Sequence, residues 1–466
     1  MKVSGLRISP WALAVALGWA LPVQAQSAQD FAAMRAEMEA MRNRIETLDA
    51  KVDALEAELA QAKSTVVKVE AAPVAPPSVT AKTATTIAWD GAPRIEAAVD
   101  PKDPKKGKWG FKPRGRLQID TAGVDAPNSI PGNSLGIATE FRRAYLGVEG
   151  TIPGNFGYRV EADFANSAVD LTDVYLTYKP KPELTLTLGQ HKPFWGLEEI
   201  TSDLFTSFME RAGFNSAFGF ERRVGLSAAY AGKSVLVQGG MFVDNAADLN
   251  NDANNSYSLD GRVVFMPRLG SGQLHLGGSL HHREFNDAAT TTRYRARPFV
   301  HTTDLRLVDT RAFSADSETS YGAELAYVRG RFHATGEGHW IVAHRPGLAD
   351  PGFFGGYAEA GLLLTDEVTA YKGGVYDRIR PRKPLGGGGM GALQLNARYD
   401  FLDLSDGAIV GGRQQVAGAS LLWIPTDYVR FIVNYGHVWI DDAAVAAGLD
   451  RDYSADTLGV RAQIDF

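Results

Sequence analysis

The end of the chain constrains its fold most strongly. The last eleven residues, DTLGVRAQIDF, alternate between two kinds of side chain and stop on an aromatic residue without a polar tail. One face of an extended strand would carry Leu458, Val460, Ala462, Ile464 and Phe466. An exposed apolar edge strand invites aggregation in water. The pattern therefore predicts a final strand whose apolar face does not meet water.

The same period of two recurs from residue 111 to residue 466. LTLTLGQ, DVYLTYK and QLHLGGSLHH each carry apolar residues on one face and polar residues on the other. Tight turns such as IPGN, KPKPE and IPTD alternate with longer polar stretches, which gives about 16 strands. Short turns on one side and longer loops on the other are typical of a transmembrane barrel. In lipid every backbone group must be paired, so the last strand must close on the first.

A soluble β-sandwich is the alternative all-β fold. It would bury its apolar faces in a core, whereas the strands here place Arg143, Arg159, Glu161 and Asp163 at inward positions, as a wet lumen requires. We therefore predict an all-β, 16-stranded antiparallel transmembrane β-barrel over residues 111–466. Phe466 would then lie at the membrane interface, where aromatic girdles belong.

The first residues predict export. Residues 1–25 combine Lys2 and Arg7 with an apolar run and a small-residue cleavage site, as in a secretory signal peptide. The apolar run is shorter than the roughly 20 residues that a membrane-spanning helix needs. Removal of Lys2 and Arg7 takes the formal net charge from -6 to -8, which argues against nucleic acid as a partner. The chain has no cysteine and therefore no disulfide.

Residues 26–69 predict an α-helical coiled coil. Apolar residues follow a spacing of three and four, namely Phe31, Met34, Met38, Met41, Ile45, Leu48, Val52, Leu55, Leu59 and Ala62. In a parallel arrangement the facing g and e positions pair opposite charges, as in Glu37 with Arg42 and Lys51 with Glu56. A parallel homo-oligomeric stalk is expected, with its chain number left open. A solvated amphipathic helix lying on its own domain is the alternative.

Residues 70–110 change in composition. Ala, Pro, Thr and Lys dominate, as in EAAPVAPPSVTAKTATT. We expect a semi-extended linker without a core of its own between the stalk and the barrel.

Long stretches of residues 111–466 resemble the phosphate-selective porin O and P family of Gram-negative outer membranes. The resemblance is carried by FRRAYLGVEGTIPGNFGYRVEADFAN, GQHKPFWGLEEITSDLFTSFMERAGFNSAFGFERRVGL, RYRARPFVHTTDLRLVDT, GGYAEAGLLLTDE and GGRQQVAGASLLWIPTDYVRFIVNYGHV. It implies a trimer of 16-stranded barrels in the bacterial outer membrane, with the coiled coil in the periplasm. It also implies that Phe466 serves as a recognition signal for barrel assembly.

Basic residues in one long loop are candidates for an anion pathway. The family resemblance implies an inward-folded loop with an arginine series, and the matching residues are Arg293, Arg295, Arg297, Arg306 and Arg311. In RYRAR the first three arginines are two residues apart, so they project the same way from an extended segment. Guanidinium groups match phosphate oxygens. The alternative is a loop held by salt bridges to Glu284, Asp287, Asp304 and Asp309.

A second loop, from about Phe194 to Glu221, is expected to fold inward as the constriction. Candidate residues in and beside it are Lys192, Glu198, Glu199, Ser202, Asp203, Arg222 and Arg223. The resemblance implies a lysine followed by hydroxyl residues near the start of this loop, but GLEEITSD offers carboxylates there. The family barrel is therefore compatible with a solute other than phosphate.

A third loop, residues 372–389, is long although it falls on the side of the tight turns. Its basic residues Arg378, Arg380, Arg382 and Lys383 would form a collar at the inner mouth of the pore. A solvated turn is the alternative.

The sequence predicts a passive channel rather than an enzyme. It contains no nucleophile constellation, no metal-ligand spacing and no cofactor motif that its context supports. We expect an outer-membrane porin that favours anions of the phosphate or polyphosphate type, with inorganic phosphate or other small anions, membrane lipid and further copies of the chain as partners. The alternatives are a general or sugar-type porin and an envelope tether whose stalk binds peptidoglycan or another envelope partner.

Overall fold

The computed structural model describes residues 85–89, 91–100, 103, 107–130, 135–165, 169–246, 256–285 and 291–466. All of them belong to one compact unit, Lys82–Phe466. The predicted signal peptide (1–25) and coiled coil (26–69) lie outside the described residues, as does the first part of the predicted linker (70–110).

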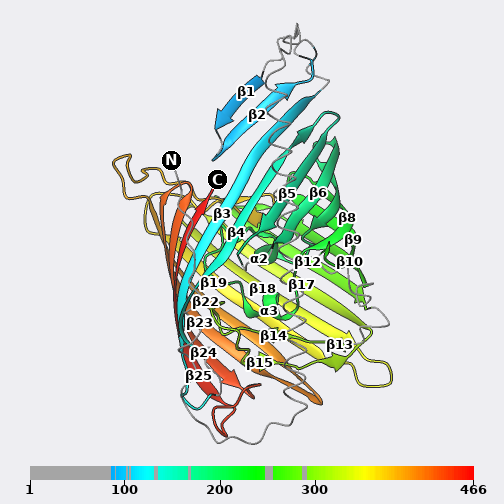
Figure 1. Cartoon of the computed structure of the whole chain (residues 1–466), viewed down its shortest axis with the longest axis vertical. Coiled ribbons are helices and arrows are strands. Elements are labelled where there is room, and N and C mark those ends of the chain that lie inside the picture. Colours follow the sequence, from blue (N-terminus) through cyan, green and yellow to red (C-terminus); the bar gives the residue numbers. More distant parts are fainter. Residues whose placement is uncertain are drawn as a thin grey trace, which may run out of the picture. The chain divides into compact units, whose positions relative to one another are not determined.

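Sixteen antiparallel strands form a closed barrel (Figure 1). The sheet contains 19 strands, of which β1, β2 and β11 lie outside the circuit. The circuit closes because β25 pairs with β3, from Asp456 opposite Asp125 to Asp465 opposite Arg116. The wall strands are β3 (Lys108–Asp125), β4 (Gly136–Ile152), β5 (Phe156–Asp163), β6 (Asp170–Lys181), β7 (Leu184–His191), β8 (Arg223–Ala231), β9 (Val235–Val243), β10 (Tyr257–Phe265), β12 (Gly272–Glu284), β17 (Ser317–Arg329), β18 (Phe332–His344), β19 (Gly352–Leu363), β22 (Ala392–Asp406), β23 (Ile409–Thr426), β24 (Val429–Asp441) and β25 (Tyr453–Asp465). The predicted 16-stranded antiparallel barrel is confirmed.

The wall alternates as the sequence predicts. In β25, Leu458 and Val460 are exposed on the outer face, whereas Arg461 and Gln463 are buried on the inner face. Phe466 extends this pattern, and its ring lies on the outer face against Gly115 of the first wall strand. Apolar side chains outside and polar ones inside are what a barrel in a bilayer requires.

The two ends of the barrel differ in the length of their connections. At one end, here called the turn end, β4 joins β5 through residues 153–155 and β23 joins β24 through residues 427–428. At the other end, the loop end, residues 192–222 and 285–316 form long connections. In bacterial barrels the short turns face the periplasm. The connection 364–391 is long but lies at the turn end, as predicted.

Short elements decorate the barrel. They are α2 (Leu197–Ile200), α3 (Gly213–Ala217), β11 (Arg268–Leu269), β13 (Thr291–Thr292), β14 (Arg295–Ala296), β15 (Val308–Asp309), β16 (Phe313–Ser314), β20 (Tyr371–Lys372) and β21 (Val375–Tyr376). In the part of the chain that the structure describes, no helix has the length and apolar character to cross a bilayer.

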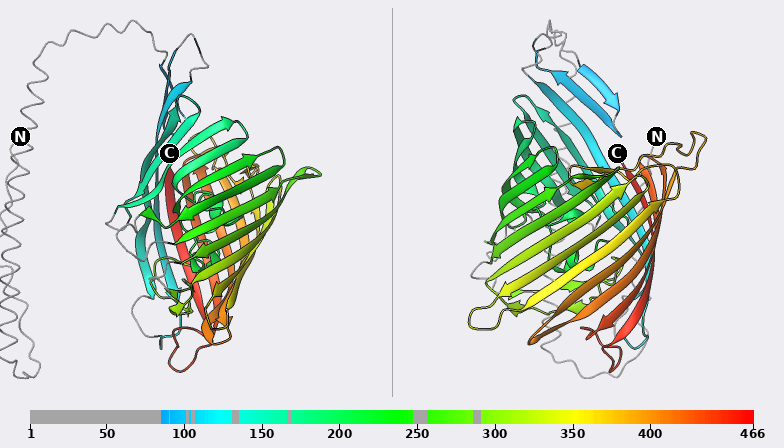
Figure 2. Two further views of the ribbon diagram at one scale, coloured as in Figure 1. Left: turned by 90° about the vertical axis from the view of Figure 1, so that its right-hand side faces the viewer. Right: turned by 180° about the vertical axis from the view of Figure 1, so that it is seen from behind.

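A hairpin of β1 (Thr85–Trp89) and β2 (Pro93–Ala98) continues the sheet at the turn end. Strand β2 pairs with the start of β3, and Figure 2 shows the hairpin beyond the rest of the wall. It lies within residues 70–110, where the composition indicated only a linker. The sequence pattern did not predict it.

Long loops fill much of the lumen. The connections 192–222 and 285–316 carry α2, α3, β14 and β15, which Figure 1 draws among the wall strands. Their aromatic residues form a dry cluster with inward residues of β18, β19 and β22 to β24, including Trp195, Phe208, Phe214, Phe220, Tyr294, Phe299, Phe353 and Tyr357. The prediction that both loops fold inward is confirmed.

A buried arginine of β22 holds the constriction loop. Nη2 of Arg398 lies 2.5 Å from Oε1 of Glu198, at the start of the loop, and 2.5 Å from Oε2 of Glu359 on β19. All three side chains are almost completely buried. Removal of one partner would leave a buried charge uncompensated, which costs about 3–5 kcal/mol.

Two further inward-facing arginines donate hydrogen bonds to backbone carbonyl groups of the same loop. Nη1 of Arg430 donates to the carbonyl oxygen of Leu204 at 2.6 Å. Nη1 of Arg461 donates to the carbonyl oxygen of Met209 at 2.6 Å, and the same guanidinium pairs with Asp120 across the β25–β3 seam at 2.6 Å. The last strand therefore both closes the barrel and positions the constriction.

Substitution of Gly115 by Val should weaken barrel closure. A Cβ at this position would lie 2.5 Å from the ring of Phe466, so the ring would be displaced at a cost of about 1–3 kcal/mol. The measurement is the temperature at which the folded form is lost, read from the mobility of unheated and heated samples in detergent gels. Gly239→Val is the matched control, because its Cβ would approach no atom closer than 3.7 Å. Equal transition temperatures for the two variants would contradict a role for the Phe466 contact.

Substitution of Arg398 by Leu should loosen the constriction loop. We expect a lower unfolding temperature and larger, noisier single-channel currents, because Glu198 and Glu359 lose their common partner. Arg413→Leu on β23 is the control: its side chain is 47% exposed and pairs with Asp403 at 2.9 Å. Such an exposed pair is worth about 0–1 kcal/mol. Quiet currents of normal size from Arg398→Leu would show that this clamp does not set the constriction.

Candidate functional site

Four neighbouring cavities lie inside the barrel, three of them beside β3 to β8 and one between the two long loops. We call them the loop-end vestibule (about 350 Å³), the neck (about 370 Å³), the inner chamber (about 480 Å³) and the turn-end vestibule (about 860 Å³). The loop-end vestibule and the neck share Arg143 and Arg211, and the neck and the inner chamber share Lys192 and Arg222. Arg159 borders both the inner chamber and the turn-end vestibule. The cavities therefore adjoin one another along the lumen, and together we call them the route.

The route is lined by an excess of positive charge. Among the described residues, eighteen Lys or Arg side chains border the four cavities, against eleven Asp or Glu side chains. The whole chain, by contrast, has a formal net charge of -6. A cleft lined by one sign of charge raises the local concentration of the opposite ion. The lining of the route is therefore positive although the chain as a whole is negative.

Three arginines of one loop crowd the loop-end vestibule. Arg295, Arg297 and Arg306 all line it. Arg297 pairs with Asp304 at 3.2 Å, but the side chain of Asp304 is 96% exposed to water. Among the described residues, none forms a hydrogen bond or ion pair with the guanidinium of Arg295. Partial burial and then the charges of Arg297 and Arg295 lower the pKa of Arg306, which still leaves it protonated at neutral pH.

Two other arginines of the predicted pathway lie elsewhere. Arg293 donates from Nε to Asp309 at 2.8 Å, and Nη1 of Arg311 lies 3.6 Å from the same carboxylate. Neither residue lines any of the four cavities. The alternative of a loop held by ion pairs thus describes Arg293, Arg311 and Arg297, although Arg297 also lines the vestibule. Arg295 and Arg306 line the vestibule without an ion pair to a described carboxylate.

At the neck, carboxylates of the constriction loop neutralise the cations around them. Nζ of Lys192 lies 2.7 Å from Glu199, whose other oxygen is 3.4 Å from Arg211. Asp203 forms ion pairs with Arg116 of β3 and with Arg143 of β4. The neck is therefore a set of paired charges, with no bare lysine among the described residues that border it.

The remaining predicted constriction residues have different positions. Ser202 lines the inner chamber, and Arg222 lines both chamber and neck while it pairs with Asp173 at 2.6 Å. Glu198 is buried against Arg398, so it holds the constriction loop in place and does not line the route. Arg223 is buried at the start of β8 and borders none of the four cavities.

A row of alternating charges on the wall was missed by sequence reasoning. Glu149 lies 2.5 Å from Arg114 and 2.7 Å from Arg159, and Asp173 lies 3.3 Å from Arg159 and 2.6 Å from Arg222. Each carboxylate is shared by two guanidiniums, which fixes the positions of all three arginines. The signal available in the sequence was the period of two that places Arg114 and Arg116 on the inner face of one strand.

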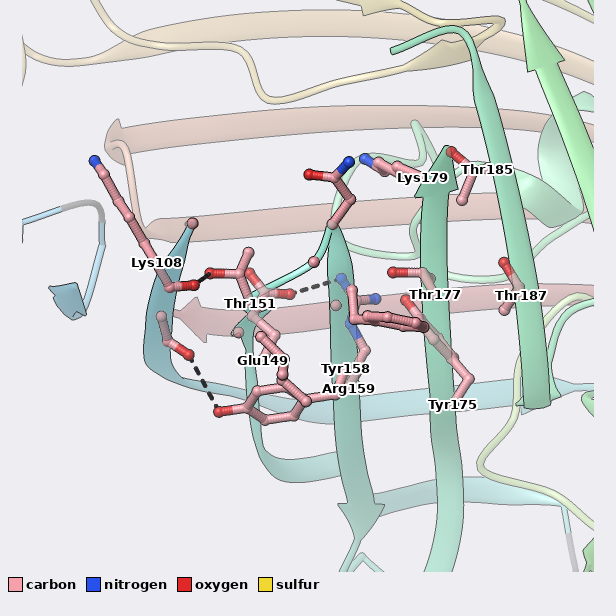
Figure 3. A pocket seen from close by; sticks show the side chains of 18 of the residues that line it. Lys108, Glu149, Thr151, Tyr158, Arg159, Tyr175, Thr177, Lys179, Thr185 and Thr187 are labelled. Atoms are coloured by element: carbon pink, nitrogen blue, oxygen red, sulfur yellow. Dashed lines mark hydrogen bonds and ion pairs between the residues drawn. The ribbon is translucent and has the colours of Figure 1, made fainter. Parts of the chain in front are cut away.

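The turn-end vestibule is lined by hydroxyl groups and lysines. Figure 3 shows Thr177, Thr185 and Thr187 on neighbouring strands, with the Glu149–Arg159 pair beside them. Hydroxyl groups both donate and accept hydrogen bonds. The hydroxyl groups of this vestibule can therefore form hydrogen bonds with a polar solute without selecting it by the sign of its charge.

The predicted collar at the inner mouth is only partly on the route. Arg378 pairs with Asp465, and Arg380 lies 2.7 Å from Asp427; both arginines line the inner chamber. The other two predicted members are exposed and border none of the four cavities, namely Arg382 and Lys383. The described residues contain no group of three or more His, Asp or Glu side chains that could hold a metal ion.

Comparisons with known proteins agree with this architecture. A curated relative from Caulobacter vibrioides, an uncharacterized protein, is 43% identical over 416 residues, which cover 87% of this chain and 82% of the relative. Among solved structures, an anion-selective porin from Comamonas acidovorans matches with a TM-score of 0.51 at 13% identity, over 77% of this chain and all of that one (100%). The outer-membrane protein OmpT of Vibrio cholerae matches with a TM-score of 0.50 at 12% identity, over 77% and 98% of the two chains. These two structures show the shared fold.

The family model described as phosphate-selective porin O and P matches residues 111–466, the segment that forms the barrel and its route. The chain belongs to the phosphate-selective porin O and P family and is an outer-membrane porin.

Proposed function

We propose that the protein is a passive diffusion channel that favours small anions, inorganic phosphate among them. The observation that carries this proposal is the crowding of Arg295, Arg297 and Arg306 in the loop-end vestibule, where Asp304 faces water. Rings of basic side chains favour anions in pores. An anion that enters the vestibule would relieve the mutual repulsion of the three guanidiniums. The anion-selective porin from Comamonas acidovorans has the same fold, which is consistent with the proposal.

The ion pairs at the neck favour passage of an anion over tight binding. Lys192, Arg116 and Arg143 already share carboxylates, so a phosphate ion would have to compete with Glu199 and Asp203 for their donors. We propose that phosphate is drawn to the loop end and crosses the neck without tight binding. A general porin without phosphate preference is the second candidate, and the same two carboxylates favour it.

Oligomerisation completes the proposal. OmpT of Vibrio cholerae has been solved in a trimer form, with a TM-score of 0.50 to this chain at 12% identity over 77% and 99% of the two chains. We propose a trimer, with the coiled coil predicted over residues 26–69 as a periplasmic stalk. A stalk of this kind could also act as a tether to peptidoglycan or another envelope component.

Removal of the vestibule charges should reduce anion selectivity. With Arg295, Arg297 and Arg306 all replaced by Ala, we expect the chloride-to-potassium permeability ratio to fall roughly threefold or more, because the local positive potential is lost. The measurement is the reversal potential of the purified protein in a planar bilayer under a salt gradient. The double variant Arg293→Ala and Arg311→Ala is the matched control, since both residues belong to the same loop but lie off the route. Equal shifts of the reversal potential in the two variants would contradict a specific role of the vestibule in anion selectivity.

Neutralisation of one neck carboxylate should strengthen phosphate binding. Glu199→Gln frees Lys192 and Arg211 from a negative charge, so phosphate should block chloride current at roughly three- to tenfold lower concentration. Glu183→Gln is the control, because this exposed turn residue borders none of the four cavities. An unchanged phosphate response in Glu199→Gln would show that the neck carboxylates do not set phosphate affinity.

A further inference from the structure

The inner chamber has two unlike walls. One wall lies along the barrel strands and presents four guanidiniums, those of Arg114, Arg116 and Arg159 on β3 and β5 and that of Arg222 just before β8. The other wall belongs to the constriction loop and presents four apolar side chains, those of Phe194, Ile200, Leu204 and Phe205. A phosphate or chloride ion would interact with the first wall and gain nothing from the second. The apolar wall therefore needs a different explanation from the selectivity for small anions.

The guanidinium wall keeps donors for a ligand. Arg159 donates from its two terminal nitrogens to Glu149 and Asp173, and each of these nitrogens carries a second N–H. The recorded hydrogen bond of Arg222 comes from its Nε, to Asp173. A guanidinium carries five N–H donors in a planar fork that fits a carboxylate or phosphate. The row is therefore fixed in position by its ion pairs and still able to bind an anionic head group.

The apolar wall is partly exposed to the chamber, because Ile200 is half-buried whereas Phe194 and Leu204 are buried. Phe205 is half-buried, and the guanidinium of Arg378 lies 5.2 Å from the centre of its ring. Phe194, at the start of the same loop, packs edge-on against Phe242 of β9 with ring centres 6.2 Å apart. Apolar surface in contact with water is covered favourably by any apolar body of matching shape. A volume of about 480 Å³ lies within the roughly 300–1,000 Å³ of typical small-molecule sites.

We propose that the inner chamber is a transient binding site for small organic anions that join a carboxylate or phosphate head to a flat apolar body. The head would lie on the arginine row at Arg159 and Arg222, and the body would lie against Ile200 and Phe205. This inference rests on the proposed passage of anions and adds a class of solute to it. The site lies on the turn side of the neck, so it acts on solutes after the charged neck has admitted them.

The test uses the full-length protein in planar bilayers with sodium benzoate, sodium acetate or benzyl alcohol added at the turn end. Benzoate carries both parts of the proposed ligand, whereas acetate lacks the ring and benzyl alcohol lacks the charge. We expect benzoate to block chloride current at a concentration at least about fivefold lower than acetate, and benzyl alcohol to leave the current unchanged. In Phe205→Ser the benzoate block should weaken roughly three- to tenfold. Phe332→Ser, on the outer wall, is the matched control and should keep the block.

The outcomes separate this inference from the proposed function. Equal block by benzoate and acetate, or an unchanged benzoate block in Phe205→Ser, would overturn the chamber site while an anion-favouring reversal potential still supported the channel. A cation-favouring reversal potential in the unmodified protein would overturn the proposed anion selectivity itself. Block by benzyl alcohol as strong as that by benzoate would also overturn the site, because it would show that the arginine row takes no part.

Discussion

In a closed barrel within a bilayer, the polar side chains of the strands have to face the lumen. Backbone groups cannot remain unpaired in lipid, so β25 must pair with β3, and the period of two then directs every second residue inward. Charges that face inward are removed from bulk water by the loops that fill the barrel, and buried charges are tolerated only when they are paired. Much of the structure follows from this pairing. Arg461, for example, bonds Asp120 across the closing seam and Met209 of the constriction loop at the same time.

The division of the lumen into a dry side and a wet side follows from the same constraint. The aromatic residues of the long loops pack against β18, β19 and β22 to β24, and Arg398 and Arg430 anchor the loop from that side. What remains open is the route beside β3 to β8, where arginines outnumber the carboxylates that hold them. The fixed ion pairs of Glu149 and Asp173 keep the guanidiniums of this wall extended along the path rather than collapsed onto each other.

The sequence alone was enough to predict the strands of the barrel wall. It was not enough to predict how the long loops are arranged in the lumen. Alternation assigns Arg159 to the lumen and Leu458 to the outer face, because a strand has only two faces and the turns fix its register. It cannot tell which of Arg293, Arg295 and Arg297 lines a cavity, because the path of the loop depends on contacts with β22 to β25 that are remote in sequence. The β1–β2 hairpin was not predicted because its strands are only five and six residues long and lie in a segment of linker-like composition. The Arg114–Glu149–Arg159 row joins three strands and becomes visible only when their register is known.

The order of charges along the route argues for a channel that attracts without trapping. Permeation needs a site favourable enough to enter and weak enough to leave. At the loop end the guanidiniums of Arg295 and Arg306 lack a buried carboxylate partner among the described residues and can draw an anion in. At the neck Glu199 and Asp203 already pair with the donors that would hold it, so we expect the ion to pass on without tight binding. Beyond the neck, charge alone does not separate anions that carry the same charge, so discrimination among them has to come from other contacts. In the inner chamber such contacts are offered by the half-buried Ile200 and Phe205 of the constriction loop, and on this basis we propose that the chamber favours anions with an apolar body.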